Sequence, residues 1–132
     1  MNTKDVLLEF VRHINSQNVH GLCSLMSEDH RFVDGLGSMV QGREQMREAW
    51  TGYFRLIPDY QISLEEIFEN GNVIAAFGTA GGTYSPDGKL SEEHRWRVPA
   101  AWRAEVREDL VTEWRVYADN EPIRQLMAKT QG

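Results

Sequence analysis

Apolar residues near the N-terminus recur at intervals of three and four positions: Val6, Leu7, Phe10, Val11 and Ile14. This helical spacing, with Thr3 in position to cap it, predicts an amphipathic helix over residues 3–16. A shorter apolar set follows the polar pair Gln17-Asn18 and predicts a second helix over residues 19–26, packed on the first. Both helices bury one face, so they belong to a domain with a core.

A third helical repeat spans residues 46–57 and ends at Pro58, because proline cannot continue a helix. Its apolar face is unusually aromatic and carries Trp50, Tyr53 and Phe54. Residues 30–34, which lie between the second and third helices, predict a short strand.

From Tyr60 onward apolar and polar residues alternate, as they do in strands with one buried face. Turn sequences divide this region at Asn70-Gly71, Ser85-Pro86-Asp87-Gly88 and Glu108-Asp109. The predicted strands begin at residue 60 and continue over residues 73–84, 94–107 and 110–118, before a tail helix over residues 122–127. Pro99 interrupts the third strand and indicates a bulge or an edge position.

Helices followed by four long antiparallel strands predict an α+β fold, with the helices on the concave face of a strongly curved, mostly antiparallel sheet. That arrangement encloses a pocket at the open end of the sheet. The chain has no repeats, low-complexity tracts or linkers, so residues 1–132 are predicted to form a single domain.

The net charge of −6 argues against nucleic-acid binding, which depends on Lys and Arg. No stretch approaches the roughly 20 apolar residues that cross a bilayer, and no apolar leader opens the chain, so we expect a cytoplasmic protein without a membrane partner. Cys23 is the only cysteine and His13, His20, His30 and His94 are scattered, so neither a metal site nor a cofactor is predicted.

The stretch Phe32-Val33-Asp34-Gly35-Leu36-Gly37 ends an apolar strand in one carboxylate, just before Gly42-Arg43-Glu44-Gln45-Met46 opens the aromatic helix. A carboxylate at the mouth of an apolar cavity is suited to proton transfer, which makes Asp34 a candidate general base. A turn aspartate that accepts hydrogen bonds from the glycine-rich bend would have the same sequence.

These two motifs, together with the closing Glu113-Trp114-Arg115-Val116-Tyr117-Ala118-Asp119, resemble the nuclear transport factor 2-like superfamily. Within it the chain is most similar to the SnoaL-like and ketosteroid-isomerase-like branch, over nearly its whole length. The resemblance implies a cone-shaped sheet around a pocket. The superfamily includes enzymes, ligand-binding proteins and dimerisation modules, so the resemblance indicates the fold more strongly than the function.

The resemblance also assigns positions. Asp34 takes the place of the general base of ketosteroid isomerases, whereas their two oxyanion donors fall on Phe10 and Trp102, which cannot play the same part. A shift of three residues would place His13 at the first of these positions. Polyketide-cyclase relatives use carboxylates on later strands, for which Asp119 is the candidate, although it is also suited to cap the tail helix. The Arg-x-Asp arrangement of epoxide-hydrolase relatives is replaced by Arg95-Trp96-Arg97.

Two functions remain open. In the first, the protein is a cofactor-independent isomerase, cyclase or dehydratase that binds a small apolar molecule, with Asp34, Asp119 and His13 as candidate catalytic residues. The second is a ligand-binding or dimerisation domain without chemistry. The predicted pocket wall consists of Phe10, Trp50, Tyr53, Phe54, Trp102 and Trp114. Further apolar residues of the last strand, Leu110, Trp114 or Val116, predict a homodimer through the other face of the sheet.

Overall fold

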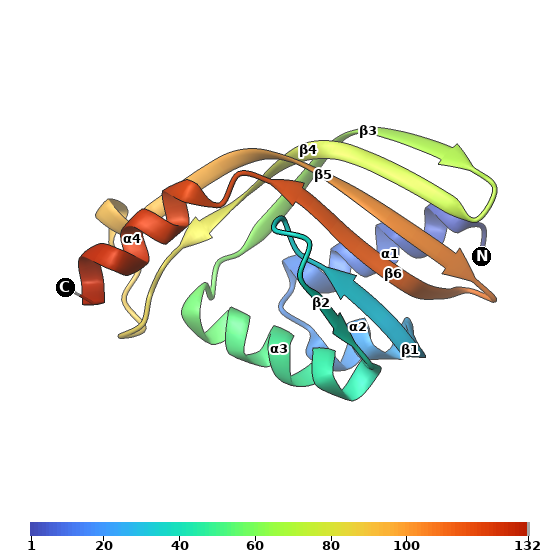
Figure 1. Ribbon diagram of the computed structural model, residues 1–132, viewed down its shortest axis with the longest axis horizontal. Coiled ribbons are helices and arrows are strands. Elements are labelled where there is room, and N and C mark those ends of the chain that lie inside the picture. The colour runs from blue at the N-terminus through green and yellow to red at the C-terminus, as the bar shows by residue number, and fades with distance from the viewer. Residues whose placement is uncertain (132) are drawn as a thin grey trace.

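The four α-helices and the five longer strands of residues 1–131 succeed one another in the order that the hydrophobic spacing predicts (Figure 1). The computed structural model describes residues 1–131. In that range the helices are α1 (Thr3–Asn15), α2 (Val19–Ser24), α3 (Arg43–Leu56) and α4 (Glu121–Gln131), with a short 3-10 helix η1 (Glu92–His94). The strands of the same range are β1 (Met26–Val33), β2 (Met39–Gln41), β3 (Gln61–Asn70), β4 (Val73–Thr83), β5 (Arg95–Arg107) and β6 (Leu110–Ala118).

The strands form one sheet in the order β2-β1-β6-β5-β4-β3. Neighbouring strands are antiparallel except β1 and β6, which run parallel. The sheet is strongly curved and stays open between its edge strands β2 and β3, and α1, α2 and α3 lie on its concave side (Figure 1). The predicted α+β class, the curved and mostly antiparallel sheet, and the placement of the N-terminal helices are confirmed.

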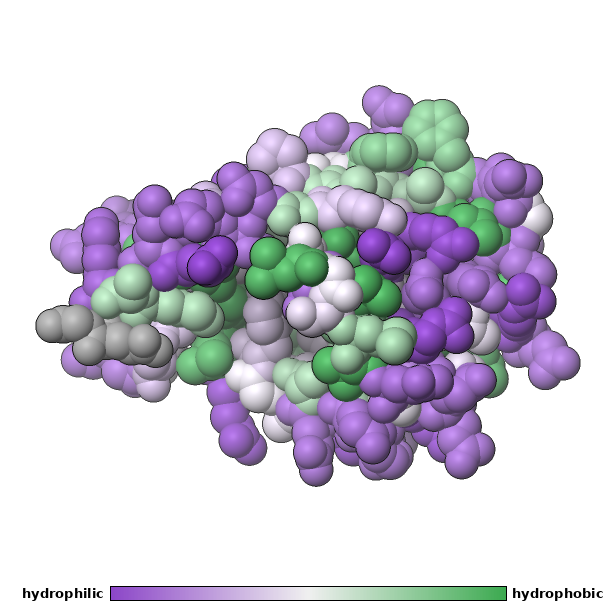
Figure 2. Space-filling view, in the orientation of Figure 1, coloured by the Kyte–Doolittle hydropathy of each residue, from purple (hydrophilic) through white to green (hydrophobic). Residues whose placement is uncertain are grey.

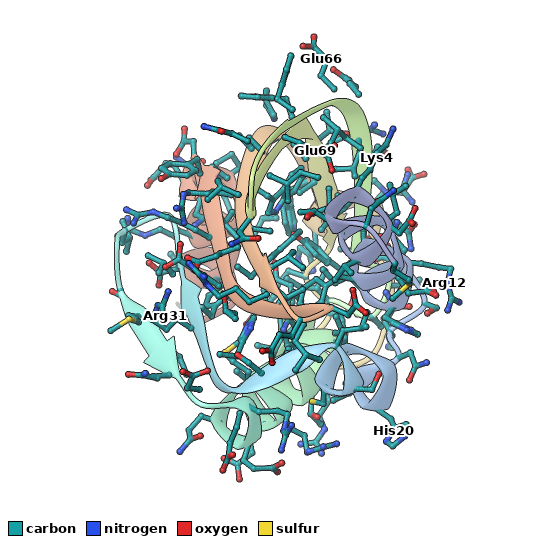
Figure 3. The ribbon with its side chains drawn as sticks, turned by 90° about the vertical axis from the view of Figure 1, so that its right-hand side faces the viewer. Lys4, Arg12, His20, Arg31, Glu66 and Glu69 are labelled. Atoms are coloured by element: carbon teal, nitrogen blue, oxygen red, sulfur yellow. The ribbon has the colours of Figure 1, made fainter. Side chains whose placement is uncertain are left out.

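The core fills the concave side of the sheet. Phe10 of α1 lies against Trp114 of β6, with 4.9 Å between ring centroids, and Trp114 stacks on Trp102 of β5 at 6.3 Å. All three side chains are at most 1% exposed. In an end view the labelled Lys4 and Arg12 of α1 lie on the outside of the molecule (Figure 3). The aromatic residues of different elements therefore hold the helices to the sheet.

The N-terminal boundary of α1 differs slightly from the predicted one. Asn2 caps the helix, because its Oδ1 accepts a hydrogen bond from the backbone N–H of Asp5 at 2.8 Å. The Asp5 carboxylate in turn accepts one from the backbone N–H of Asn2 at 3.2 Å. Thr3, the predicted cap, is the first residue of the helix. The side-chain oxygen of Asn2 therefore makes the capping hydrogen bond that was expected of the Thr3 hydroxyl.

The region between the second and third helices contains more strand than predicted. The second helix ends at Ser24, and β1 begins at Met26 instead of His30. The parallel ladder with β6 explains the difference, because Met26 pairs with Val111 and the Val111 N–H donates to the Leu25 carbonyl at 2.6 Å. Strand β2 was not predicted, and its three residues are all exposed. The early start of β1 depends on its pairing with β6, and β2 depends on its pairing with β1. The local spacing of apolar residues does not indicate either pairing.

The long strand β5 alternates as predicted, with every second residue from Trp96 to Val106 buried. Pro99 has the predicted edge position on one side, since the ladder between β5 and β6 reaches only as far as Ala100. The bulge lies elsewhere, where Glu105 pairs with Glu113 and Val106 pairs with Val111. The extra residue, Thr112, places Val111 and Trp114 on the same buried face although they are three positions apart.

None of the helices in residues 1–131 is both long enough and apolar enough to cross a membrane.

Candidate functional site

A cavity of about 480 Å³ opens between the concave face of the sheet, α3 and α4. Its walls are mainly apolar and are formed by Phe32, Met46, Ala49, Trp50, Tyr53, Tyr60, Ala80, Trp96, Val98, Trp114, Val116, Ala118, Ile123 and Met127. Asp34, Asn120 and Arg124 add polar groups to the lining. Apolar side chains also gather on the surface between α4 and the loop after β1 (Figure 2). The volume lies within the roughly 300–1,000 Å³ of ordinary small-molecule sites.

Helix α3 forms one wall because its apolar residues fall on two adjacent stripes. Met46, Trp50 and Phe54 recur every four residues and are buried. Tyr53 lies beside them and makes an edge-to-face contact with Trp50, at 6.0 Å and 89°. Phe54 stacks on Trp50 at 5.2 Å. The helix thus presents an aromatic surface whose rings support one another.

The opposite wall comes from inward-facing positions of β5 and β6. Trp96 and Val98 alternate on β5, and Trp114 and Val116 alternate on β6, so all four side chains face the cavity. Helix α4 contributes Ile123, which is 7% exposed, together with Arg124 and Met127. Helix α4 therefore forms a third wall of the pocket, beside those of the sheet and α3.

Asp34 lies directly after β1 at the edge of the pocket and is partly exposed. Its Oδ1 accepts hydrogen bonds from the backbone N–H groups of Leu36 at 2.9 Å and Ser38 at 3.0 Å. Among the described residues no group donates to its Oδ2. A Cβ on Gly35 would come within 2.8 Å of the Ala118 carbonyl, so a glycine there lets the loop lie close to β6. Asp34 is therefore a turn aspartate that also lines the pocket.

The other two candidate catalytic residues lie elsewhere. Asp119 is exposed, and its Oδ1 accepts a hydrogen bond from the backbone N–H of Glu121 at 3.0 Å, which is a capping contact at the start of α4. His13 of α1 lies beside Asn18, with 3.3 Å between its Nδ1 and the amide nitrogen. Neither residue lines the cavity. The structure therefore brings Asp34 to the pocket without Asp119 or His13.

The predicted wall divides into two groups. Trp50, Tyr53 and Trp114 line the cavity, whereas Phe10, Phe54 and Trp102 belong to the core behind it. Phe10 and Trp102 occupy the positions that oxyanion donors would take by resemblance. They lie where α1 packs directly on the sheet and closes the space, so a ligand in the cavity does not reach them.

Several pocket residues were missed by sequence reasoning, notably Tyr60, Trp96 and Arg124. Alternation along residues 94–107 puts Trp96 on the same side of its strand as Trp102, which is a usable signal. It did not show which end of the strand the helices leave uncovered.

Burial raises the pKa of Tyr60, and it raises that of Tyr53 well above the usual value with a smaller contribution from the neighbouring Tyr60. Both side chains are therefore neutral hydroxyls at physiological pH.

Within the described part of the chain, no three His, Cys, Asp or Glu side chains gather in an arrangement that could hold a metal ion. Only one acidic side chain, that of Asp34, lines the cavity over the same residues. The chemistry available to a bound molecule therefore comes from this carboxylate and from neutral or basic donors.

Comparison with known proteins identifies the same architecture. A sequence model of the SnoaL-like domain matches residues 7–114. No curated protein matches the chain in sequence. A candidate SnoaL-like polyketide cyclase from Shewanella putrefaciens is 13% identical, with 98% of this chain and 88% of that chain covered and a TM-score of 0.81.

Two further solved structures are similar. A hypothetical protein with a ketosteroid isomerase-like fold from Catenulispora acidiphila is 19% identical, with 92% and 91% of the two chains covered and a TM-score of 0.79. A candidate polyketide cyclase from Streptomyces antibioticus is 19% identical, with 97% and 99% covered and a TM-score of 0.78. At these identities the likeness shows a shared fold.

Proposed function

The chain belongs to the SnoaL-like domain family, and on that premise we propose that its pocket binds a small, flat, mostly apolar carbonyl compound on which Asp34 transfers a proton. One observation carries the proposal: an open aromatic cavity whose lining, among the described residues, includes a single carboxylate. The proposed protein is a cofactor-independent enzyme of the isomerase, cyclase or dehydratase type.

The proton transfer balances without a cofactor. The Asp34 carboxylate takes a proton from the carbon next to the carbonyl group, and the electrons of that C–H bond move to give an enolate. The neutral Asp34 then returns the proton to another carbon in an isomerisation. In a cyclisation the enolate carbon attacks a second carbonyl group, and the alkoxide that forms takes the proton from Asp34. In a dehydration the proton of Asp34 passes to a hydroxyl group, which leaves as water. Each of these outcomes ends with Asp34 ionised again.

The geometry around Asp34 suits this role. Two backbone N–H groups fix Oδ1, so the second oxygen is held in a defined orientation and has no competing donor among the described residues. The apolar walls exclude water from a bound ligand, which strengthens electrostatic interactions within the site.

Asp34→Asn tests the proposal. The amide oxygen can still accept the hydrogen bonds from Leu36 and Ser38, so the turn is kept, but the side chain can no longer accept a proton. We expect deuterium incorporation next to the carbonyl group of 1-tetralone in D2O, followed by mass spectrometry, to fall by about a hundredfold or more while binding persists.

Asp87→Asn is the matched control, because the Asp87 carboxylate also accepts a turn hydrogen bond, from the Lys89 N–H at 3.1 Å, and Asp87 does not line the cavity. This variant should exchange deuterium at the wild-type rate. Equal rates for Asp34→Asn and the wild type would show that Asp34 is not the base.

A second candidate function is ligand binding without chemistry. The observation that favours it is the engagement of Asp34 Oδ1 in the turn, with neither His13 nor Asp119 in the cavity to act as a second catalytic group. If 1-tetralone binds and its exchange in the presence of the wild type stays at the rate in buffer, this candidate is the correct one.

A further inference from the structure

Two tyrosines stand together in the wall of the cavity. Tyr53 comes from α3 and Tyr60 from the connection into β3, and their rings meet edge to face at 5.1 Å and 87°. Both side chains line the cavity, and Tyr60 is only 7% exposed. Trp96 also lies close to Tyr60, with 6.1 Å between the ring centroids. The packing fixes both rings, so the hydroxyl groups have defined positions.

These hydroxyls are donors without an acceptor. Neither makes a hydrogen bond to another described residue, and neither belongs to the fully covered polar atoms that lack a partner, so each still reaches open space. The indole N–H groups of Trp50 and Trp96 differ, because they are fully covered although their rings line the same cavity. A ligand can therefore accept a hydrogen bond from the tyrosines but not from these tryptophans.

The polar groups of the cavity also lie on different elements. Asp34 follows β1, Asn120 directly precedes α4 and Arg124 lies in its first turn, whereas Tyr53 belongs to α3 and Tyr60 to the connection into β3. Because burial keeps both phenols protonated, the pair offers two neutral O–H donors. A carbonyl oxygen has two lone pairs and can accept from both.

We propose that Tyr53 and Tyr60 together bind one acceptor oxygen of the ligand, which selects flat ring compounds with a carbonyl group over hydrocarbons of the same shape. The inference deepens the proposed function and rests on its assumption that the cavity binds the ligand. When Asp34 removes the neighbouring proton, charge moves to this oxygen, and the same two donors stabilise the enolate.

Binding of 1-tetralone and of tetralin, its analogue without the oxygen, tests the proposal by titration calorimetry. The wild type should bind 1-tetralone more tightly than tetralin. Each of Tyr53→Phe and Tyr60→Phe should lower the affinity for 1-tetralone by about fivefold, and the double variant by more, while the affinity for tetralin stays the same. Phenylalanine keeps the ring, so the aromatic packing survives.

Tyr84→Phe serves as the control, because Tyr84 is 6% exposed and does not line the cavity. An unchanged preference for 1-tetralone in the double variant, or an equal loss of affinity for both probes, would overturn the inference. Asp34→Asn should keep the preference. If the tyrosine variants behave as the wild type and deuterium exchange still depends on Asp34, only the tyrosine inference fails. If neither probe binds the wild type, the proposed function fails with it.

Discussion

His30 of β1 is fully buried, and its imidazole makes one hydrogen bond, from Nδ1 to the Val111 carbonyl oxygen at 2.6 Å. Its Nε2 is covered and has no partner among the described residues. Burial lowers the pKa of His30, and the positive charge of Arg31 acts in the same direction. The hydrogen bond to Val111 and the charges of Asp29 and Glu113 oppose this shift. The folded protein therefore holds this imidazole neutral.

A neutral buried histidine makes stability depend on pH. The folded pKa lies below the unfolded value of about 6.5, so the unfolded state binds the extra proton first as the pH falls. We expect the His30 contribution to be fully present above about pH 6.5 and to decline below it, by at most about 1.4 kcal/mol per pH unit. Urea unfolding at pH 5 to 7.5 measures this slope.

His30→Asn keeps a donor for the Val111 carbonyl oxygen and removes the titration, so its unfolding free energy should change less between these pH values than that of the wild type. His20→Asn is the control, because His20 is exposed (Figure 3). An equal slope in the wild type and His30→Asn would contradict the assignment.

Single residues also show how far the sequence could predict the site. Asp34 was found because its signal is local: a strand end, a carboxylate and a glycine bend adjoin in the chain. Trp96 and Trp102 share one face of β5, yet only Trp96 lines the cavity. The difference depends on where α1 covers the sheet, and alternation along one strand carries no information about that.

At the scale of elements, the sequence predicted the strands that bury one face, because their apolar residues alternate. It did not predict a strand that exists only through its pairing with a neighbouring strand. Residues 39–41 form β2 by pairing with β1, although none of them is buried. Thr112 changes the inward face of β6 through a bulge that only the pairing with β5 reveals. Periodicity in the sequence predicted the order of the main helices and strands. Strand β2 and the bulge at Thr112 depend on hydrogen bonds between segments far apart in the sequence, which periodicity does not show.

The hairpin between β5 and β6 has an unfavourable turn. Its central residues, Glu108 and Asp109, have φ values of 52° and 64°, a left-handed conformation that favours Asn and Gly. Changing the pair to Asn-Gly should raise the unfolding free energy by about 1 kcal/mol, as measured by urea unfolding. The change also removes an exposed contact between Asp109 and the N-terminus at 3.7 Å, which contributes little.

The hairpin between β3 and β4 provides the reverse experiment. Gly71 has a φ of 62°, and a Cβ there would meet nothing within 4 Å. Gly71→Ala should therefore lower stability through backbone strain alone, by a similar amount. A gain from Gly71→Ala, or a loss from the Asn-Gly change, would show that turn conformation does not limit these hairpins.

At the scale of the molecule, the outer face of the sheet carries an apolar row across three strands. Phe77 of β4, Ala101 of β5 and Tyr117 of β6 are consecutive register partners. Phe77 is 46% exposed, Tyr117 is 50% exposed, and Phe68 of β3 meets Phe77 edge to face at 6.0 Å. Trp114 and Val116, two of the residues first considered for this face, line the cavity on the other side. Phe77 and Tyr117, and not Trp114 or Val116, are therefore the apolar side chains of this row that are exposed on the outer face of the sheet.

Charges of both signs lie beside this row. Glu113 pairs with Arg31, on the flank of the sheet labelled in Figure 3, and with Arg103. Arg115 lies over the Tyr117 ring at 5.2 Å and makes no ion pair among the described residues. An apolar row with arginine and glutamate on the same face can complement a second copy of itself around a two-fold axis. We therefore propose that this face forms the predicted homodimer.

Sedimentation at tens of micromolar tests the homodimer, since the monomer has a mass of 15.2 kDa and a dimer has twice that mass. Phe77→Glu should give a monomer with unchanged melting cooperativity, because it places two like charges in the interface and Phe77 is half exposed in the single chain. Leu8→Glu is the matched control, because Leu8 is 42% exposed on α1, which packs against the opposite face of the sheet. A wild-type monomer at this concentration would contradict the proposal, and so would a dimer that Leu8→Glu dissociates and Phe77→Glu leaves intact.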